Sequence, residues 1–297
     1  MNGKLCDTGK REGFVRLPSL FAIKINMIRQ QIQLLQYVFS CQLRHKETAE
    51  YFQIPEPKSN AAPVAEISVL QRDWDELRTQ GFADSAHTEY SILTPYFSEA
   101  LVPYECVIIH AAALRWRDHA YLICAESGVG KSTQANWLQK LRPGAFSVIC
   151  GDRPILEFRQ AAESKGGVSA PASLGVAFSS IKQASTKRTD VVYVHPSPWN
   201  GKENWHGADA APLAGLILLN RGEENCIVSL SEREAALPLY PQFIHTGWNP
   251  EMIRRIADLE TRLLNAASIW RLTTHDVPAS TRLLLETVFQ CKIGSCY

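Results

Sequence analysis

Residues 125–133 read Ala-Glu-Ser-Gly-Val-Gly-Lys-Ser-Thr and lie between an apolar segment, 120–125, and an amphipathic segment, 130–141. The apolar segment predicts a strand, and the amphipathic segment predicts a helix. A glycine-rich turn between a strand and a helix is typical of phosphate-binding loops, because backbone N–H groups and the positive helix N-terminus then face phosphate oxygens. The stretch therefore predicts an α/β domain with an anion site at one edge of its sheet.

Each part of this loop has an expected role. Gly128 and Gly130 let the backbone curl, Lys131 contacts the β- and γ-phosphates, and the Ser132 hydroxyl completes a Mg²⁺ shell. The expected nucleotide-binding set is Glu126, Ser127, Gly128, Val129, Gly130, Lys131, Ser132 and Thr133. The usual pattern, G-x-x-x-x-G-K-[ST], starts with glycine, whereas this chain has Ala125, the mildest replacement unless a positive φ is needed. The alternative is a glycine turn that only starts a helix.

An acidic residue outside the loop is needed to hold a metal beside it. The apolar run 216–219 ends in Asn220, so it does not supply an acid. The apolar run 146–150 leads into Gly151-Asp152-Arg153. We expect Asp152 at the carboxyl edge of the strand next to the loop, within reach of a metal at Ser132. The alternative is that residues 152–154 form a polar turn.

A histidine in an apolar segment is another candidate. His110 lies fifteen residues before Ala125, and the chain reverses at Arg117-Asp118 between them. The two residues are therefore expected at the same end of two paired strands. This placement favours contact of His110 with phosphates or metal, although a lone histidine can equally be a hydrogen-bonded core residue.

The stretch Ser197-Pro198-Trp199-Asn200-Gly201-Lys202-Glu203 is also unusual. Two prolines, Pro196 and Pro198, an aromatic residue and a glycine before a lysine are typical of a rigid loop. Such a loop would present Lys202 to an anion, either a phosphate or a substrate carboxylate. The alternative is a surface turn.

The rest of the chain reads as alternating strands and helices without a fixed repeat. Spacings of three and four between apolar residues over 14–40 predict a helix or two helices, which we expect to pack against the body or a second copy of the chain. The alternative is a membrane-surface helix, suggested by Arg16, Lys24 and Arg29. Residues 55–63 are polar, bracketed by prolines, and predict a linker. We divide the chain into a helical extension and linker (1–62), a small α+β lead-in subdomain (63–104), a mixed α/β catalytic domain (105–290) and a tail (291–297).

Composition limits the classes of function. The 297 residues are 45% hydrophobic and carry a net charge of +1, which predicts a globular chain without a general attraction to nucleic acid. No apolar run approaches the roughly 20 residues of a membrane span, and we expect no secretory signal. The eight cysteines include no C-x-x-C pair, and Cys106, Cys124 and Cys150 lie in apolar runs as small hydrophobic residues would. These features favour a cytoplasmic protein. Cys291 and Cys296 could instead bridge or bind a metal.

Taken in order, His110, residues 127–133, Gly151-Asp152-Arg153-Pro154 and residues 198–202 resemble the HPr kinase-like proteins, distant relatives of ATP-dependent phosphoenolpyruvate carboxykinases. The resemblance covers roughly residues 64–290 and is to the small bacterial branch often encoded beside peptide-modification genes. It implies a mixed sheet with a phosphoenolpyruvate-carboxykinase-like nucleotide site, preceded by a small N-terminal α+β portion.

The resemblance also implies roles for residues of this chain. ATP and Mg²⁺ are the implied cofactors, Lys131, His110 and Asp152 the implied catalytic residues, and Ser132 and Asp152 the implied metal ligands. The residues implied to bind substrate are Arg153, Trp199, Gly201 and Lys202. Two features depart from the family: Gly151-Asp152 replaces two adjacent acids, and no Glu-Ile-Arg-Gly stretch occurs.

The implied activity is transfer of the γ-phosphate of ATP to a serine-type hydroxyl of a peptide or small protein. Because the Glu-Ile-Arg-Gly stretch is missing, phosphorylation of HPr is not implied. The alternatives are a small-metabolite kinase, a nucleotide-binding regulatory protein that has lost transfer, and a carboxykinase-like lyase. The apolar stripe over 14–40 permits a homo-oligomer.

Overall fold

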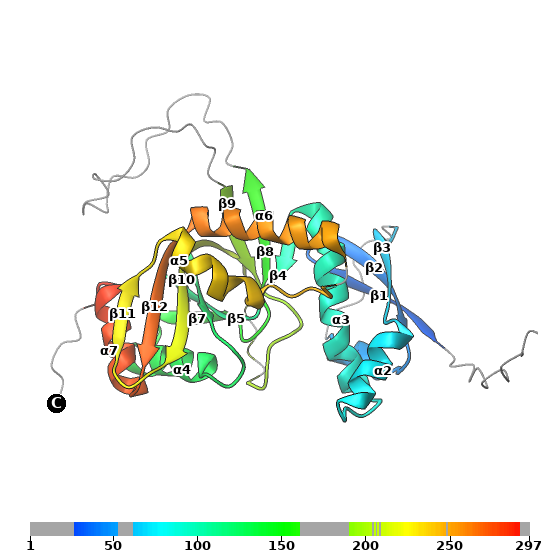
Figure 1. Ribbon diagram of the computed structural model, residues 1–297, viewed down its shortest axis with the longest axis horizontal. Helices are drawn as coiled ribbons and strands as arrows, with labels where there is room; N and C mark the ends of the chain where they lie inside the picture. The colour runs from blue at the N-terminus through cyan, green and yellow to red at the C-terminus, as the bar shows by residue number, and fades with distance from the viewer. Residues whose placement is uncertain are drawn as a thin grey trace, which may run out of the picture.

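The computed structural model describes residues 27–52, 62–160, 190–203, 205, 207, 209–247 and 249–291. These ranges contain twelve strands and seven α-helices, and the strands form a small three-stranded sheet and a nine-stranded mixed sheet. Figure 1 shows the small sheet with helices α2 and α3 at one end of the molecule and α7 at the other. The chain is a mixed α/β protein, which confirms the predicted class.

The part at the first end, residues 27–104, is called the N-terminal unit below. Its elements are β1 (Ile28–Leu34), β2 (Tyr37–Leu43), α1 (Thr48–Tyr51), β3 (Ala65–Ser68), α2 (Gln71–Thr79), α3 (Ala86–Leu101) and the 3₁₀ turn η1 (Val102–Tyr104). Strands β1 and β2 form an antiparallel hairpin, and β3 pairs in parallel with β2. The chain therefore returns to the hairpin after residues 53–61, which lie outside the described residues together with most of the predicted linker.

The helix predicted over 14–40 is wrong for residues 28–40, which form β1, the first part of β2 and the turn between them. Central strand β2 is buried on both faces, so its apolar residues run almost continuously and can match a helical spacing as well as a strand. Pairing with β3 and packing against α3 decide between the two, and neither is visible locally. Residues 28–43 thus pack with residues 63–101 instead of forming a separate extension. Residues 14–26 lie outside the described residues.

The nine strands that follow the N-terminal unit form the large sheet. Its strands are β4 (Cys106–Ile108), β5 (Ala111–Trp116), β6 (His119–Cys124), β7 (Phe146–Cys150), β8 (Ile155–Gln160), β9 (Asp190–His195), β10 (Ala211–Arg221), β11 (Cys226–Ser229) and β12 (Ser268–Thr274). They are ordered β4-β8-β9-β10-β6-β5-β7, with β12 also paired to β10 and β11 to β12. Only the first two residues of β10, Ala211 and Pro212, pair with β9. The sheet therefore curls, and β4, β8 and β9 form a second layer.

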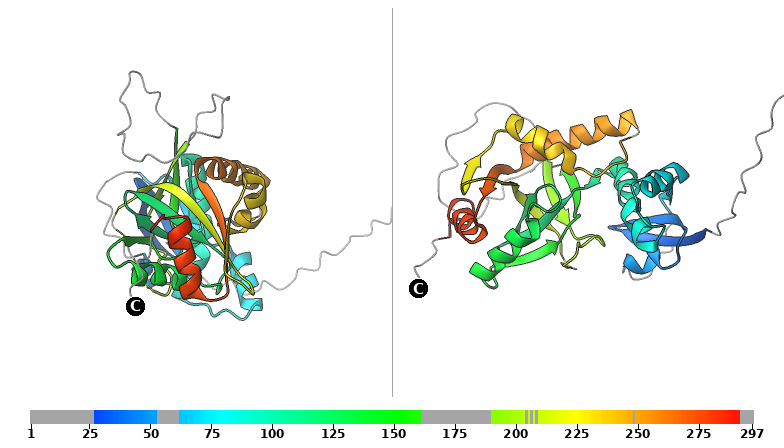
Figure 2. Two further views of the ribbon diagram at one scale, coloured as in Figure 1. Left: turned by 90° about the vertical axis from the view of Figure 1, so that its left-hand side faces the viewer. Right: turned by 60° about the horizontal axis from the view of Figure 1, so that its bottom comes forward.

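The helices cover the two faces of β5, β6 and β10 (Figure 2). Helices α4 (Lys131–Leu141) and α7 (Val277–Thr287) pack on one face through a core that includes Leu138, Ile217 and Leu284. The other face packs against β8 and β9 and against helices α5 (Glu232–Leu239) and α6 (Pro250–Ala266). The edge where β6 ends and α4 begins stays open between these layers.

Strand order corrects the expected position of Asp152. Strand β5 lies between β6 and β7 and is antiparallel to both, so β7 is not the strand next to β6. Because β6 and β7 run in the same direction, their carboxyl ends still meet at one edge. The strand predicted over 106–116 is broken at Ile109 and His110. These two residues separate β4, which pairs with β8, from β5, which pairs with β6 and β7.

Other expectations from the sequence can also be compared with the structure. Cys106, Cys124 and Cys150 are buried free thiols, as expected, and burial raises the pKa of Cys106 and of Cys124 to about 12. Cys296 lies outside the described residues, so its pairing with Cys291 is untested. Among the helices that the structure describes, none has the length and apolar character to cross a bilayer.

A buried acid on α6 is expected to make stability depend on pH. Glu260 is 7% exposed, and in the described part of the chain its Oε1 atom has no hydrogen-bond partner. Burial raises the pKa of Glu260 from 4.5 to about 7. Between these values the folded state keeps a proton that the unfolded state has lost. The free energy of unfolding therefore falls as pH rises from about 4.5 to about 7.

We expect Glu260→Gln to remove this fall, which should amount to something on the order of 2 kcal/mol between about pH 5 and about pH 8. Urea unfolding followed by circular dichroism at several pH values in that range measures the effect. Glu286→Gln, at an exposed position of α7, is the matched control. An identical pH profile for wild type and Glu260→Gln would contradict the prediction.

Candidate active site

The loop between β6 and α4 adopts backbone angles that its glycines permit. Gly128 has φ +82° and Gly130, the N-cap of α4, has φ +121°. Residues with a Cβ atom strongly disfavour these backbone angles, so the two glycines are required for the curl of the loop. Ala125 does not have a positive φ and is almost fully buried. Alanine therefore fits at the position where the motif usually has glycine.

Lys131, at the start of α4, points from this loop toward β5. Its side chain is buried, its Nζ atom lies 2.8 Å from Nε2 of His110, and it donates a hydrogen bond to the Ala125 carbonyl at 3.1 Å. Burial lowers the pKa of Lys131. The ammonium group thus lies inside the loop, beside Nε2 of His110 and the Ala125 carbonyl, a position from which it can turn to an anionic ligand.

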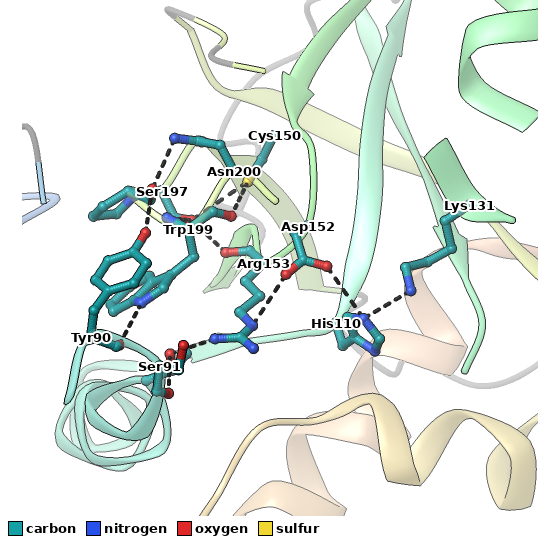
Figure 3. Close-up of polar contacts among 12 residues, drawn as sticks. Tyr90, Ser91, His110, Lys131, Cys150, Asp152, Arg153, Ser197, Trp199 and Asn200 are labelled. Atoms are coloured by element: carbon teal, nitrogen blue, oxygen red, sulfur yellow. Dashed lines mark hydrogen bonds and ion pairs between the residues drawn. The ribbon is translucent and has the colours of Figure 1, made fainter. Parts of the chain in front are cut away.

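His110 and Asp152 continue the contact from Lys131 (Figure 3). Nε2 of His110 lies 3.3 Å from Oδ1 of Asp152. This nitrogen therefore faces a donor and an acceptor: unprotonated it accepts from Lys131, and protonated it donates to Asp152. Ala111 pairs with Cys124, which confirms that His110 and Ala125 lie at the same end of paired strands.

Buried Gln242 fixes the backbone of His110. Its carbonyl accepts the His110 N–H at 2.7 Å. With its side-chain nitrogen turned inward, Gln242 donates to the carbonyls of His110 and Ala125 at 3.2 and 3.0 Å. Gln242, which follows α5, thus holds the start of β5 and the end of β6 together. Sequence reasoning missed Gln242, because no motif surrounds it.

Asp152 is ionised near neutral pH. Burial disfavours its charge, but the hydrogen bond to His110 and the positive charges of Arg153 and Lys131 outweigh burial, so the pKa of Asp152 lies below its ordinary value. The backbone of Asp152 is also held, because its carbonyl accepts from the N–H of Ala111 at 2.8 Å. The carboxylate is therefore a fixed anionic oxygen ligand in the middle of the site.

Arg153 connects Asp152 to the N-terminal unit. Its Nε atom lies 3.3 Å from Oδ2 of Asp152, and its Nη1 donates to Oγ1 of Thr94 on α3 at 2.8 Å. Thr94 in turn donates to the Ser91 carbonyl at 2.9 Å, which Pro95, without an N–H, cannot do from the next turn of the helix. A continuous chain of polar contacts therefore runs from the β6–α4 loop to α3 (Figure 3).

Trp199 lies beside this chain but outside the cleft, contrary to the contact with substrate implied for it. Its side chain is 2% exposed and packs among Tyr90, Phe97 and Phe52 of the N-terminal unit. Its indole N–H donates to the Tyr90 carbonyl at 3.3 Å, and its own carbonyl accepts the N–H of Arg153 at 3.1 Å. Trp199 therefore anchors the loop 196–203 and positions Arg153.

The structure gives a physical reason for the missing second acid. A Cβ atom on Gly151 would lie 2.2 Å from the backbone oxygen of Asn200. Because backbone cannot yield as a flexible side chain does, residues larger than glycine do not fit at position 151 while the loop 196–203 keeps this position. The approach of this loop therefore requires glycine beside Asp152 and leaves no room there for a second acid.

Residues from six parts of the chain line a cleft of about 670 Å³. Of the predicted site residues, those lining it are His110, Ser127, Gly128, Gly130, Lys131, Ser132, Thr133, Asp152, Arg153, Gly201 and Lys202. Glu126 is exposed outside the cleft, and Val129 packs its side chain against the core beneath α4 and α7. The cleft is also lined by residues that were not predicted as site residues: Gly151 and Glu203, which lie within the quoted motifs, and Ser91, Thr94, Pro95, Pro241, Phe243, Ile244 and His245, which lie outside them.

Comparison with known proteins adds a weak structural similarity. No family model and no curated protein matches the chain. A solved structure of the HPr(Ser) kinase/phosphatase from Coxiella burnetii is similar at a TM-score of 0.27 and 12% sequence identity, over 62% of this chain and 93% of that one. A TM-score of this size carries no functional argument, so the proposals below rest on the cleft itself.

The oxygen ligands in the cleft fit a magnesium ion better than a metal that needs a full protein cage. The Ser132 hydroxyl and the ionised Asp152 carboxylate both line the cleft. Among the described residues, no group of three or more His, Cys, Asp and Glu side chains could hold a metal. Magnesium is usually bound by one or two protein oxygens, with phosphates and water completing its shell. Ser132 and Asp152 would hold it here.

Proposed function

We propose that this chain is a kinase that uses ATP and Mg²⁺ to phosphorylate a serine-type hydroxyl of a peptide or small protein. The observation that supports this most is the contact chain Lys131–His110–Asp152, which ends in the glycine loop on one side and opens into the cleft on the other. These contacts bring together a cation for phosphates, a metal ligand and a base, as phosphoryl transfer requires.

In this proposal the β6–α4 loop binds the triphosphate. Backbone N–H groups at Gly128 to Thr133 and the N-terminus of α4 face the phosphate oxygens, and Glu126 and Val129 contribute backbone only. Lys131 leaves the Ala125 carbonyl and His110 to contact the β- and γ-phosphates. Mg²⁺, when bound, neutralises charge on these phosphates. Loss of the Lys131 contact frees Nε2 of His110 to donate toward Asp152 or the γ-phosphate.

Asp152 receives the proton of the acceptor. The hydroxyl oxygen forms a bond to the γ-phosphorus, the bond from that phosphorus to the β–γ bridging oxygen breaks, and ADP leaves. The hydroxyl proton passes to the Asp152 carboxylate. A lowered pKa makes Asp152 a weak base, but phosphoryl transfer depends mainly on positioning and charge stabilisation, so one held carboxylate can act both as metal ligand and as proton acceptor.

The acceptor enters between α3 and the segment 241–245. Arg153 and Lys202 supply positive charge there, and Pro95, Phe243 and Ile244 supply apolar surface. Such a surface suits a peptide segment around the acceptor hydroxyl. Arg153 is held from both sides by Asp152 and Thr94, whereas Lys202 is exposed at the rim of the cleft.

Transfer of labelled γ-phosphate from ATP, with Mg²⁺, into an extract of the source cells tests the proposal. The extract is separated into protein, short-peptide and metabolite fractions, and Lys131→Ala protein is the blank. Label in the protein or peptide fraction supports the proposal and delivers the acceptor for sequencing. Label in the metabolite fraction alone would replace it with a small-molecule kinase. Binding of Mg-ATP without label in any fraction would leave a regulatory nucleotide-binding protein.

Lys202→Ala is expected to weaken acceptor binding selectively. The lysine lies on the loop 196–203 at the cleft rim, away from the β6–α4 loop in sequence. Loss of one exposed charge contact should raise the KM for the acceptor about three- to tenfold with the Kd for ATP nearly unchanged. Steady-state kinetics with the identified acceptor and titration with ATP measure the two constants, and Lys140→Ala on α4 is the control. The reverse pattern would place Lys202 on the nucleotide.

A further inference from the structure

Arg221 lies against the glycine loop on the side opposite to His110. It is the last residue of β10, which pairs in parallel with β6, so the carboxyl ends of both strands meet at the loop. Its Nη2 atom is 3.2 Å from the position that a Cβ atom on Gly130 would occupy. The guanidinium group is therefore in contact with the loop at the N-cap of α4.

The side chain of Arg221 is exposed, and its guanidinium group has no partner in the part of the chain that the structure describes. Among the residues that the structure describes, no hydrogen bond, ion pair or aromatic ring contacts its side chain, although Glu223 and Glu224 follow in the same turn. Other arginines near the cleft differ: Arg153 is held by Asp152 and Thr94. An arginine without a partner beside a loop rich in N–H donors adds positive charge where the loop already favours anions.

The strands on either side of β6 define which part of a bound triphosphate Arg221 can reach. Strand β6 lies between β5, which carries His110 into the site, and β10, which carries Arg221. A triphosphate seated in the loop with its γ-phosphate toward His110 and Asp152 extends its other end toward the start of α4 and the β10 flank. The group nearest to Arg221 is then the α-phosphate.

We propose that Arg221 binds the α-phosphate of the nucleotide and so fixes the direction in which the triphosphate lies in the loop. This inference rests on the proposed function and adds a nucleotide-binding residue outside the glycine motif. Arg221 holds one end of the triphosphate while Lys131, His110 and Asp152 act at the other end. The planar guanidinium can donate two parallel hydrogen bonds to phosphate oxygens, which lysine cannot.

Isothermal titration of the full chain with Mg-ATP and with inorganic tripolyphosphate tests this contact. Arg221→Met should raise the Kd for both ligands about 10- to 100-fold, because each loses a charge-assisted hydrogen bond to phosphate. Arg221→Lys should fall between wild type and Arg221→Met. Arg254→Met, at an exposed position of α6 on the other face of the sheet, is the control and should bind like wild type.

Three results would overturn the inference. Unchanged affinity of Arg221→Met for both ligands, while Lys131→Ala loses binding, would remove Arg221 from the site and leave the proposed function standing. Weakened ATP binding with unchanged tripolyphosphate binding would place Arg221 on the nucleoside. Wild type that binds neither ligand would overturn the proposed function together with this inference. Circular dichroism of each variant confirms that the binding data come from folded protein.

Discussion

Asp152→Asn is expected to lower kcat by about a thousandfold, while the Kd for Mg-ATP changes by less than about tenfold. Asparagine keeps the size and one oxygen of the side chain, so contacts with His110 and Arg153 can persist in altered form. It cannot accept the proton of the acceptor hydroxyl, and it removes the negative charge that those two residues surround. Steady-state transfer of labelled phosphate and equilibrium titration with ATP measure the two effects.

A matched control for this variant is Asp118→Asn in the exposed turn between β5 and β6, at the other end of these strands. It should retain wild-type kcat. Turnover of Asp152→Asn within about twofold of wild type would show that Asp152 does not take part in the reaction. A loss of ATP binding as large as the loss of turnover would instead make Asp152 a metal ligand alone.

Lys131→Ala is expected to abolish the stabilisation of the folded chain by nucleotide. At a ligand concentration a hundredfold above Kd, wild type should gain about 2.7 kcal/mol from Mg-ATP, and the variant should gain almost nothing. The reason is that Lys131 is the buried cation that the β6–α4 loop surrounds. Thermal unfolding with and without Mg-ATP measures the difference.

Lys140→Ala, in the last turn of the same helix, controls for the loss of a lysine from α4. Its unfolding temperature should rise with Mg-ATP as that of wild type does. Lys131→Ala protein that is still stabilised by nucleotide would move the phosphates away from the loop. Wild type that shows no shift would count against nucleotide binding itself, and so against both a kinase and a regulatory nucleotide-binding protein.

The parts of the site that sequence indicated are those encoded by local pattern. The curl of residues 125–130 follows from Gly128 and Gly130, and the helix after it follows from amphipathic spacing. The meeting of His110 with Lys131 follows from one hairpin, whose turn at Arg117-Asp118 can be read locally. The sequence also predicts the sheet edge at which Asp152 lies, but it does not predict that β5 lies between β6 and β7.

The parts that sequence missed depend on contacts between distant segments. Nothing around Thr94 or Ser91 indicates a cleft wall, because α3 reaches the site only through packing of the whole N-terminal unit. The burial of Trp199 likewise depends on Phe52 and Phe97, more than a hundred residues earlier. An aromatic residue in a proline-rich loop resembles a ligand contact until its surroundings are known.

In the proposed kinase, the anchoring of Trp199 would make acceptor recognition depend on the folding of the N-terminal unit, which contains none of the residues proposed to transfer phosphate. Its indole completes a hydrophobic cluster that also contains Phe39 and Phe97, and its carbonyl holds the backbone of Arg153. Substitutions that loosen this cluster would shift Arg153 and the loop 196–203 while the β6–α4 loop stays intact. In a mutational screen, such alleles would look like specificity mutants: nucleotide still bound, phosphate still positioned, and the acceptor no longer selected.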